Sequence, residues 1–156
     1  MHKITSRWGQ HDELKIEWNL GKRCNYDCSY CSPAIHDWNS PHHSLAVIKG
    51  FINRLDVWMQ QHRKTFSISL TGGEPFVHPE ILGILETIRS SKYSEPKLIV
   101  TTNGSLPLDL YRRAMTWVTN LTISLHLERS NTEIESILQK AVILNQEYPN
   151  SWINVQ

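Results

Sequence analysis

The chain has 156 residues, of which 40% are hydrophobic and 20% charged, and its formal net charge is +1 at pH 7. This length suits one domain with a real hydrophobic core, and the composition is that of a soluble globular chain. The near-zero net charge provides no electrostatic footprint for nucleic acid, and no apolar run approaches the roughly 20 residues of a membrane span. We therefore expect a single domain over residues 1–156, with no membrane and no specific nucleic-acid partner.

Strands and helices are predicted to alternate along the chain. Residues 14–20 alternate strictly between apolar and polar side chains, which predicts a strand. Ser40 and Pro41 then offer an N-cap and a first-turn proline for a helix whose apolar stripe runs from Leu45 to Met59. The same alternation predicts strands at 65–70, 97–102, 120–125 and 151–156, and helices that open at Pro79, at Pro107 and at the capping boxes of Ser130 and Thr132.

Strand–helix alternation with short links predicts an α/β fold with a parallel sheet and outer helices. One face of most of the strands is polar, which is unusual for a sheet that is buried on both sides. If the apolar faces meet the helices, the polar faces line a lumen that suits a polar ligand; alternatively, this face is simply exposed to water. The predicted lining residues are Lys15, Glu17, Asn19, Ser67, Ser69, Thr122 and Ser124.

The three cysteines of the chain, Cys24, Cys28 and Cys31, lie on one predicted loop after the first strand. An odd number of cysteines, with no secretory leader before them, argues against a disulfide framework. An ordinary cubane iron–sulfur cluster takes four thiolates, so three would leave one iron open to a small molecule. A structural zinc site of three cysteines and His36 is the alternative.

Other unusual residues follow the later strands. These segments are Thr71–Pro75 (TGGEP), Thr101–Gly104 (TTNG) and Ser124–His126 (SLH). Ligands of parallel α/β folds collect at the carboxyl ends of strands, so we expect these segments to meet the cysteine loop. Paired glycines let the backbone approach a ligand closely, and a glutamate beside them can accept hydrogen bonds from an ammonium group.

The cysteine spacing, with Tyr30 just before the third cysteine, resembles the signature of radical S-adenosylmethionine (SAM) enzymes. Gly72, Gly73, Glu74 and Pro75 resemble the second motif of the same family. The resemblance extends from about residue 12 to the end of the chain. It implies a partial (β/α) barrel of the radical SAM type, in which this chain supplies about five parallel strands and lacks the sixth.

The resemblance also implies roles for individual residues. The three cysteines would hold a 4Fe–4S cluster, and the amine and carboxylate of SAM would bind its fourth iron. The Gly73 backbone and Glu74 would receive the amine, and Tyr30 would flank the adenine. Contacts to the ribose or to the methionine carboxylate would come from Ser124, together with His126 or Asn103.

The implied reaction is reductive cleavage of SAM to a 5′-deoxyadenosyl radical, which abstracts hydrogen from a substrate that the sequence does not identify. Beyond the cluster, no catalytic residue is assigned. We expect an oxygen-sensitive protein in the reducing cytosol, with an external one-electron reductant of the flavodoxin or ferredoxin type. The alternative functions are a non-catalytic iron–sulfur electron carrier and a zinc-stabilised interaction domain.

Two features remain open at this stage. The missing sixth strand is consistent with a fragment of a longer product, with a second chain that completes the barrel as half of a split enzyme, or with a degenerate relative. His36, His42 and His43 follow the cysteine loop, where they are expected to form a surface loop and a first helical turn, or else to touch the substrate or cluster.

Overall fold

The computed structural model describes residues 13–32, 34 and 36–156. Within them, five parallel strands form one sheet in the order β1-β2-β3-β4-β5. The strands are β1 Glu13–Asn19, β2 Thr65–Thr71, β3 Ser94–Thr102, β4 Asn120–Ile123 and β5 Trp152–Val155. The helices are α1 Leu45–His62, α2 Ile81–Arg89, α3 Leu108–Ala114 and α4 Asn131–Glu147, with a short 3₁₀ helix η1 at Pro75–Val77. The predicted α/β fold with a parallel sheet is confirmed.

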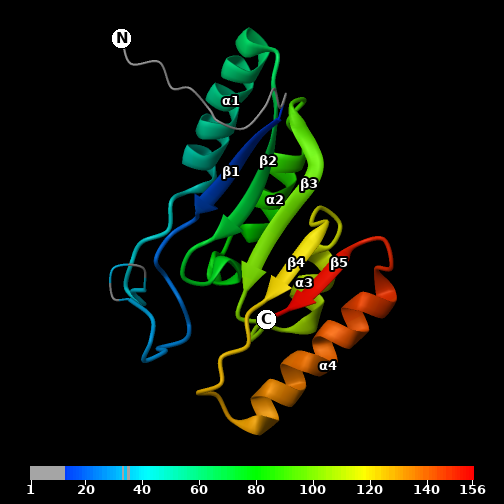
Figure 1. Cartoon of the computed structure of the whole chain (residues 1–156). Helices are drawn as coiled ribbons and strands as arrows, with labels where there is room; N and C mark the ends of the chain where they lie inside the picture. The colour runs from blue at the N-terminus through cyan, green and yellow to red at the C-terminus, as the bar shows by residue number, and fades with distance from the viewer. Residues whose placement is uncertain (1–12, 33, 35) are drawn as a thin grey trace, which may run out of the picture.

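The helices cover one side of the sheet and leave the other uncovered. In Figure 1, α1, α2 and α3 lie behind the strands, and α4 runs beside β5. The apolar strand residues face the helices: Phe66 and Leu70 of β2 have no exposed surface, and Leu121 and Ile123 of β4 are 1% exposed. Because β1 and β5 are the two edges of the described sheet, the strands form a curved open sheet of the partial-barrel type.

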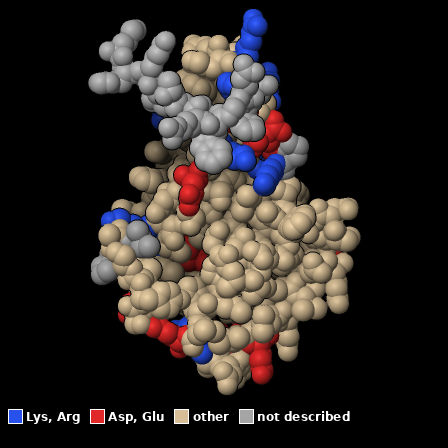
Figure 2. All heavy atoms as spheres, viewed as in Figure 1, with Lys and Arg blue, Asp and Glu red and all other residues tan. Residues whose placement is uncertain are grey.

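The polar residues of the strands share the uncovered face. Lys15 pairs with Ser67 and Glu17 pairs with Ser69, and both charged side chains on β1 are exposed. In the same view, Figure 2 shows that the middle of this face carries few charged side chains, which gather toward its upper and lower ends. Of the predicted lumen residues, those on β1 are exposed and those from β2 and β4 are buried or half-buried, so the lumen is enclosed in its middle and open along its β1 edge.

The first helix starts later than the sequence predicted. Its N-cap is Ser44, whose hydroxyl accepts a hydrogen bond from Val47 N at 3.4 Å, so Ser40 and Pro41 do not open it. A buried histidine explains the difference, because His78 Nε2 donates to the carbonyl of His43 at 2.9 Å. This bond holds the preceding residues as a loop against the start of α2.

Smaller boundary differences have local causes. Helix α2 begins at Ile81, two residues after Pro79, because Pro79 and Glu80 form a turn that is closed by the hydrogen bond from Ile81 N to His78 O at 3.1 Å. Ser130 caps α4 and accepts from Glu133 N at 3.3 Å, which places Thr132 inside the first turn and leaves its capping box unused. Among the described residues, no helix is long and apolar enough to cross a membrane.

Candidate active site

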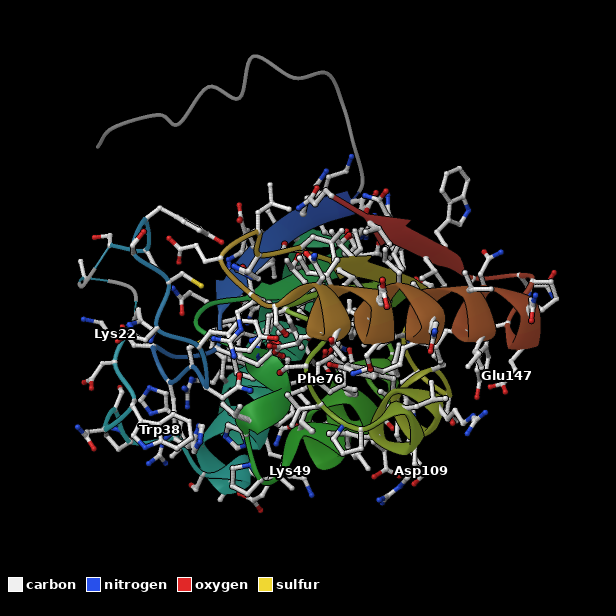
Figure 3. All side chains as sticks on the ribbon, turned by 90° about the horizontal axis from the view of Figure 1, so that it is seen from below. Lys22, Trp38, Lys49, Phe76, Asp109 and Glu147 are labelled. Carbon is white, nitrogen blue, oxygen red and sulfur yellow. The ribbon has the colours of Figure 1, made fainter. Side chains whose placement is uncertain are left out.

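A cavity of about 210 Å³ lies at the carboxyl ends of the strands. It is the place where the cysteine loop meets the ends of β2, β3 and β4. Figure 3 shows this loop, with Lys22 and Trp38 labelled, at the end of the molecule opposite Glu147 of α4, and Phe76 of η1 lies between them. The lining residues are Cys24, Tyr26, Cys28, Tyr30, Cys31, His36, Thr71, Gly72, Gly73, Thr101, Thr102, Asn103, Ser124 and His126.

All three cysteines line this cavity as free thiols. Cys24 and Cys28 are buried, and Cys31 is half-buried. Burial raises the pKa of the Cys24 and Cys28 thiols, because a thiolate is poorly solvated there. A cationic metal group in the cavity would offset this cost, since the thiolate is the form that binds metal.

The paired glycines hold the start of the cysteine loop against the end of β2. Gly73 N donates to Gly21 O at 2.8 Å, and Glu74 N donates to Arg23 O at 2.8 Å. A Cβ atom on Gly72 would overlap the Gly21 carbonyl oxygen, and one on Gly73 would overlap that of Arg23. The close approach that these glycines allow is therefore to another segment of backbone, while both also line the cavity.

The Glu74 carboxylate is buried and accepts hydrogen bonds from other residues of the chain. Its side chain is 2% exposed. Its Oε1 accepts from Phe76 N at 2.9 Å and from Thr102 Oγ1 at 2.8 Å, and its Oε2 accepts from Asn103 N at 2.6 Å. Burial raises the pKa of Glu74, although these three donors act in the opposite direction. Neither Glu74 nor Pro75 lines the 210 Å³ cavity, whereas all the other predicted site residues do.

Asn103 connects the end of β3 with the cysteine loop. Its Nδ2 donates to Asn25 Oδ1 at 2.9 Å and lies 3.9 Å from Cys24 Sγ. Asn25 Nδ2 in turn donates to Ser105 Oγ at 2.8 Å, and Ser105 Oγ donates back to Asn103 Oδ1 at 2.6 Å. This closed ring of hydrogen bonds fixes the loop beside Cys24.

The end of β4 brings Ser124 and His126 to the cavity. The His126 ring lies parallel to the Tyr30 ring, with centroids 5.9 Å apart, and its Nδ1 lies 3.2 Å from Cys28 Sγ. The Tyr30 hydroxyl also contacts His126 Nδ1. Burial lowers the pKa of His126, which favours the neutral imidazole.

Tyr26 is a cavity residue that the sequence analysis did not single out. It is 4% exposed, its hydroxyl donates to Glu133 of α4, and the Arg129 guanidinium lies 4.3 Å from its ring centroid. Ser29 N donates to Glu128 at 2.9 Å, which gives the loop a second link to the segment before α4. Because these partners are about a hundred residues apart in sequence, no local pattern predicts them.

The histidines after the cysteine loop have separate positions. His36 lines the cavity, and its Nδ1 lies 3.8 Å from Asp27 Oδ1. His42 packs on His78, with ring centroids 4.5 Å apart, and the side chain of His43 is exposed. Of the three, only His36 reaches the cavity.

The donor set fits a 4Fe–4S cluster. Three thiols face one cavity that has no carboxylate in its lining, and soft thiolates are the ligands of iron–sulfur clusters, as they are of zinc. The His36 Nε2 atom is buried and has no hydrogen-bond partner among the described residues. Within that same part of the chain, no three His, Cys, Asp or Glu side chains converge closely enough to hold a single metal ion.

The model of the radical SAM superfamily matches residues 18–143, so the chain belongs to the radical SAM superfamily. It is 31% identical over 126 residues to molybdenum cofactor biosynthesis protein 1 of Drosophila melanogaster, covering 78% of this chain and 21% of that protein. It is 30% identical over 122 residues to GTP 3',8-cyclase of Haemophilus ducreyi, covering 74% of this chain and 33% of that protein. The chain thus spans a third or less of the length of these relatives.

Solved structures show the same fold. The structure of anSMEcpe with bound AdoMet matches with a TM-score of 0.64 and 16% identity, over 92% of this chain and 43% of that one. BtrN in complex with AdoMet and 2-DOIA matches with a TM-score of 0.59 and 16% identity, over 78% of this chain and 53% of that one. Both likenesses support the partial radical SAM barrel.

Proposed function

We propose that this chain is the core of an enzyme that holds a 4Fe–4S cluster on Cys24, Cys28 and Cys31. The bound cluster would supply one electron to cleave S-adenosylmethionine and so generate a 5′-deoxyadenosyl radical for hydrogen abstraction from a substrate. The observation that carries the proposal is the meeting of all three thiols in one cavity with the glycine turn and the end of β4. An external one-electron reductant of the flavodoxin or ferredoxin type is the expected partner.

The cavity residues would bind and orient S-adenosylmethionine. Tyr30 is 63% exposed at the cavity and offers a ring face to the adenine. Ser124, Asn103 and His126 offer hydroxyl, amide and imidazole groups to the ribose or the methionine carboxylate. The Gly73 backbone lines the cavity where the amine would bind.

We assign Glu74 an indirect part in that binding. Both of its oxygens already accept hydrogen bonds from Phe76, Thr102 and Asn103. Its carboxylate would therefore act on the amine mainly by holding Gly73 and Asn103 in position. A direct contact would require one of these three bonds to give way.

The test is anaerobic reconstitution with iron and sulfide. We expect about four irons per chain, a brown oxygen-sensitive protein, and 5′-deoxyadenosine after addition of dithionite and S-adenosylmethionine. Replacing each cysteine with alanine should abolish both the cluster and the product. Four irons without any 5′-deoxyadenosine would favour the electron-carrier alternative, and zinc with no binding of S-adenosylmethionine would favour a zinc-stabilised module.

The comparison with known proteins suggests one substrate to test first. Because relatives at 30–33% identity are GTP 3',8-cyclases, GTP is the first substrate to test. Incubation of the reconstituted protein with GTP and deuterium-labelled GTP should transfer deuterium into 5′-deoxyadenosine if GTP is the hydrogen donor. Product formation that is independent of GTP, with no label transfer, would reject GTP and leave the proposed cleavage of S-adenosylmethionine intact.

A further inference from the structure

His126 lies against one of the three cysteine sulfurs. The 3.2 Å separation between its Nδ1 and Cys28 Sγ lies within the range of an N–H···S hydrogen bond. The imidazole is held on two sides, by the parallel ring of Tyr30 and by the edge-on ring of Tyr26, whose centroid is 5.4 Å away. Among the described residues, no ring nitrogen makes such a contact with Cys24 or Cys31.

The backbone around His126 is fixed by the sheet. Ser124 N donates to Thr102 O at 2.8 Å on one side of β4, and Leu125 N donates to Gln156 O at 2.7 Å on the other. The His126 carbonyl then accepts from Arg129 N at 2.9 Å in the following turn. The imidazole is therefore positioned by the β4 ladder and does not depend on a freely moving loop.

The chemistry of the sulfur decides which atom donates. A metal-bound cysteine is a thiolate, which has no proton and can only accept. For the His126 contact to be a hydrogen bond, Nδ1 must then carry the proton. When Nδ1 carries the proton, the Tyr30 oxygen that also contacts Nδ1 can only accept there, and the Tyr30 hydroxyl proton is left for another acceptor.

We propose that His126 donates a hydrogen bond from Nδ1 to the Cys28 thiolate and thereby raises the reduction potential of the bound cluster. This inference rests on the proposed function, since it requires the cluster. Hydrogen bonds to cluster sulfurs stabilise the more negative reduced state, so each donor makes reduction easier. The role differs from a contact to S-adenosylmethionine because it acts on the ligand sulfur before that molecule binds.

The experiment is a redox titration of the reconstituted protein without added S-adenosylmethionine, in which electron paramagnetic resonance monitors the reduced cluster. His126→Phe keeps a flat ring between the two tyrosines and removes the donor. We expect its equilibrium constant for one-electron reduction to fall about tenfold, which is about 59 mV for a one-electron couple. His126→Asn places an amide N–H close to the position of Nδ1 and should keep the wild-type midpoint.

A matched control is His62→Phe, because His62 lies in the last turn of α1, contacts the carbonyl and the ring of Trp58, and does not line the cavity. Its midpoint should equal that of wild type. An unchanged midpoint in His126→Phe at full iron content, or equal shifts in His126→Phe and His126→Asn, would overturn the inference. If His126→Phe binds no cluster, His126→Asn provides the test. A wild-type midpoint potential supports the hydrogen-bond donor, and a threefold or larger change in the equilibrium constant for reduction contradicts it.

The failure of the proposed function has a different signature. If wild-type protein binds no iron–sulfur cluster, the function itself is wrong and the inference falls with it. If wild-type protein binds the cluster and cleaves S-adenosylmethionine, but the midpoint potential is the same in the His126 variants, only the role of His126 is rejected.

Discussion

Glu74 and Asn103 join the ends of two neighbouring strands through a buried hydrogen bond. Asn103 N donates to Glu74 Oε2 at 2.6 Å, and the two residues are 2% and 4% exposed. Asn103 in turn contacts Asn25 on the cysteine loop. One carboxylate therefore links the glycine motif after β2 to the loop that carries the thiols.

Replacing Glu74 with alanine should destabilise the whole domain. Asn103 N, Phe76 N and the Thr102 hydroxyl would lose their buried acceptor, so we expect the free energy of unfolding to fall by about 3 kcal/mol. Urea denaturation measures the loss. Glu80→Ala is the control, because within the described part of the chain the exposed Glu80 carboxylate accepts only from Leu45 N, and its loss should cost about 1 kcal/mol or less. Equal losses in the two variants would contradict this role of Glu74.

Replacing Gly73 with alanine should loosen the cysteine loop. The new Cβ would overlap the Arg23 carbonyl oxygen, so the backbone of one segment has to move, at a cost of about 1–3 kcal/mol. We expect a lower urea midpoint and less iron per chain after reconstitution.

Gly50→Ala is the matched control for this change. Gly50 lies inside α1, and its Cβ would meet only Arg54 Nη1, at 3.7 Å. Alanine is the better helix former, so this variant should gain about 0.5–1 kcal/mol. Wild-type iron content and stability in Gly73→Ala would show that the two segments are not packed as described.

Replacing Tyr26 with phenylalanine should weaken the link between the cysteine loop and α4. The variant keeps the buried ring but removes the hydrogen bond to Glu133, which we expect to cost about 1 kcal/mol. Limited proteolysis should cut the loop faster. Tyr93→Phe is the control, since its hydroxyl has no hydrogen bond to the described residues; faster cleavage in both variants would refute the specific link.

The ion pair between α3 and α4 should make stability depend on pH. Arg112 donates to both carboxylate oxygens of Glu147, at 2.6 and 2.9 Å, and lowers the pKa of that carboxyl. A carboxyl with a lowered pKa stabilises the fold above its unfolded-state pKa, and this contribution is lost as the pH falls through the folded-state value.

The measurement is urea denaturation of wild type and Arg112→Ala at pH 7 and pH 3. We expect the stability difference between them to be larger at pH 7. Arg113→Ala is the control, because Arg113 has no ion pair within the described residues. A difference that is the same at both pH values would show that Arg112 acts by packing alone.

Local patterns in the sequence predicted the fold well because they report local physics. Alternating side chains gave the strands to within a few residues, since alternation follows directly from the geometry of extended chains. The predicted start of α1 was wrong, because the helix start depends on a hydrogen bond between His43 and His78, which lie 35 positions apart in the sequence. A capping preference depends only on neighbouring residues, so it cannot predict a hydrogen bond between residues so far apart in the sequence.

The sequence by itself determined most of the residues that line the cavity, because parallel strands place their carboxyl ends together. It did not determine how those residues share their hydrogen bonds. Only the tertiary structure placed His126 against Cys28, 98 positions away in the sequence. Only the tertiary structure, likewise, showed that the Glu74 oxygens accept hydrogen bonds from η1 and from the end of β3. The physical reason is that a buried polar group must be paired, and its partner is whichever group the packed chain brings within reach.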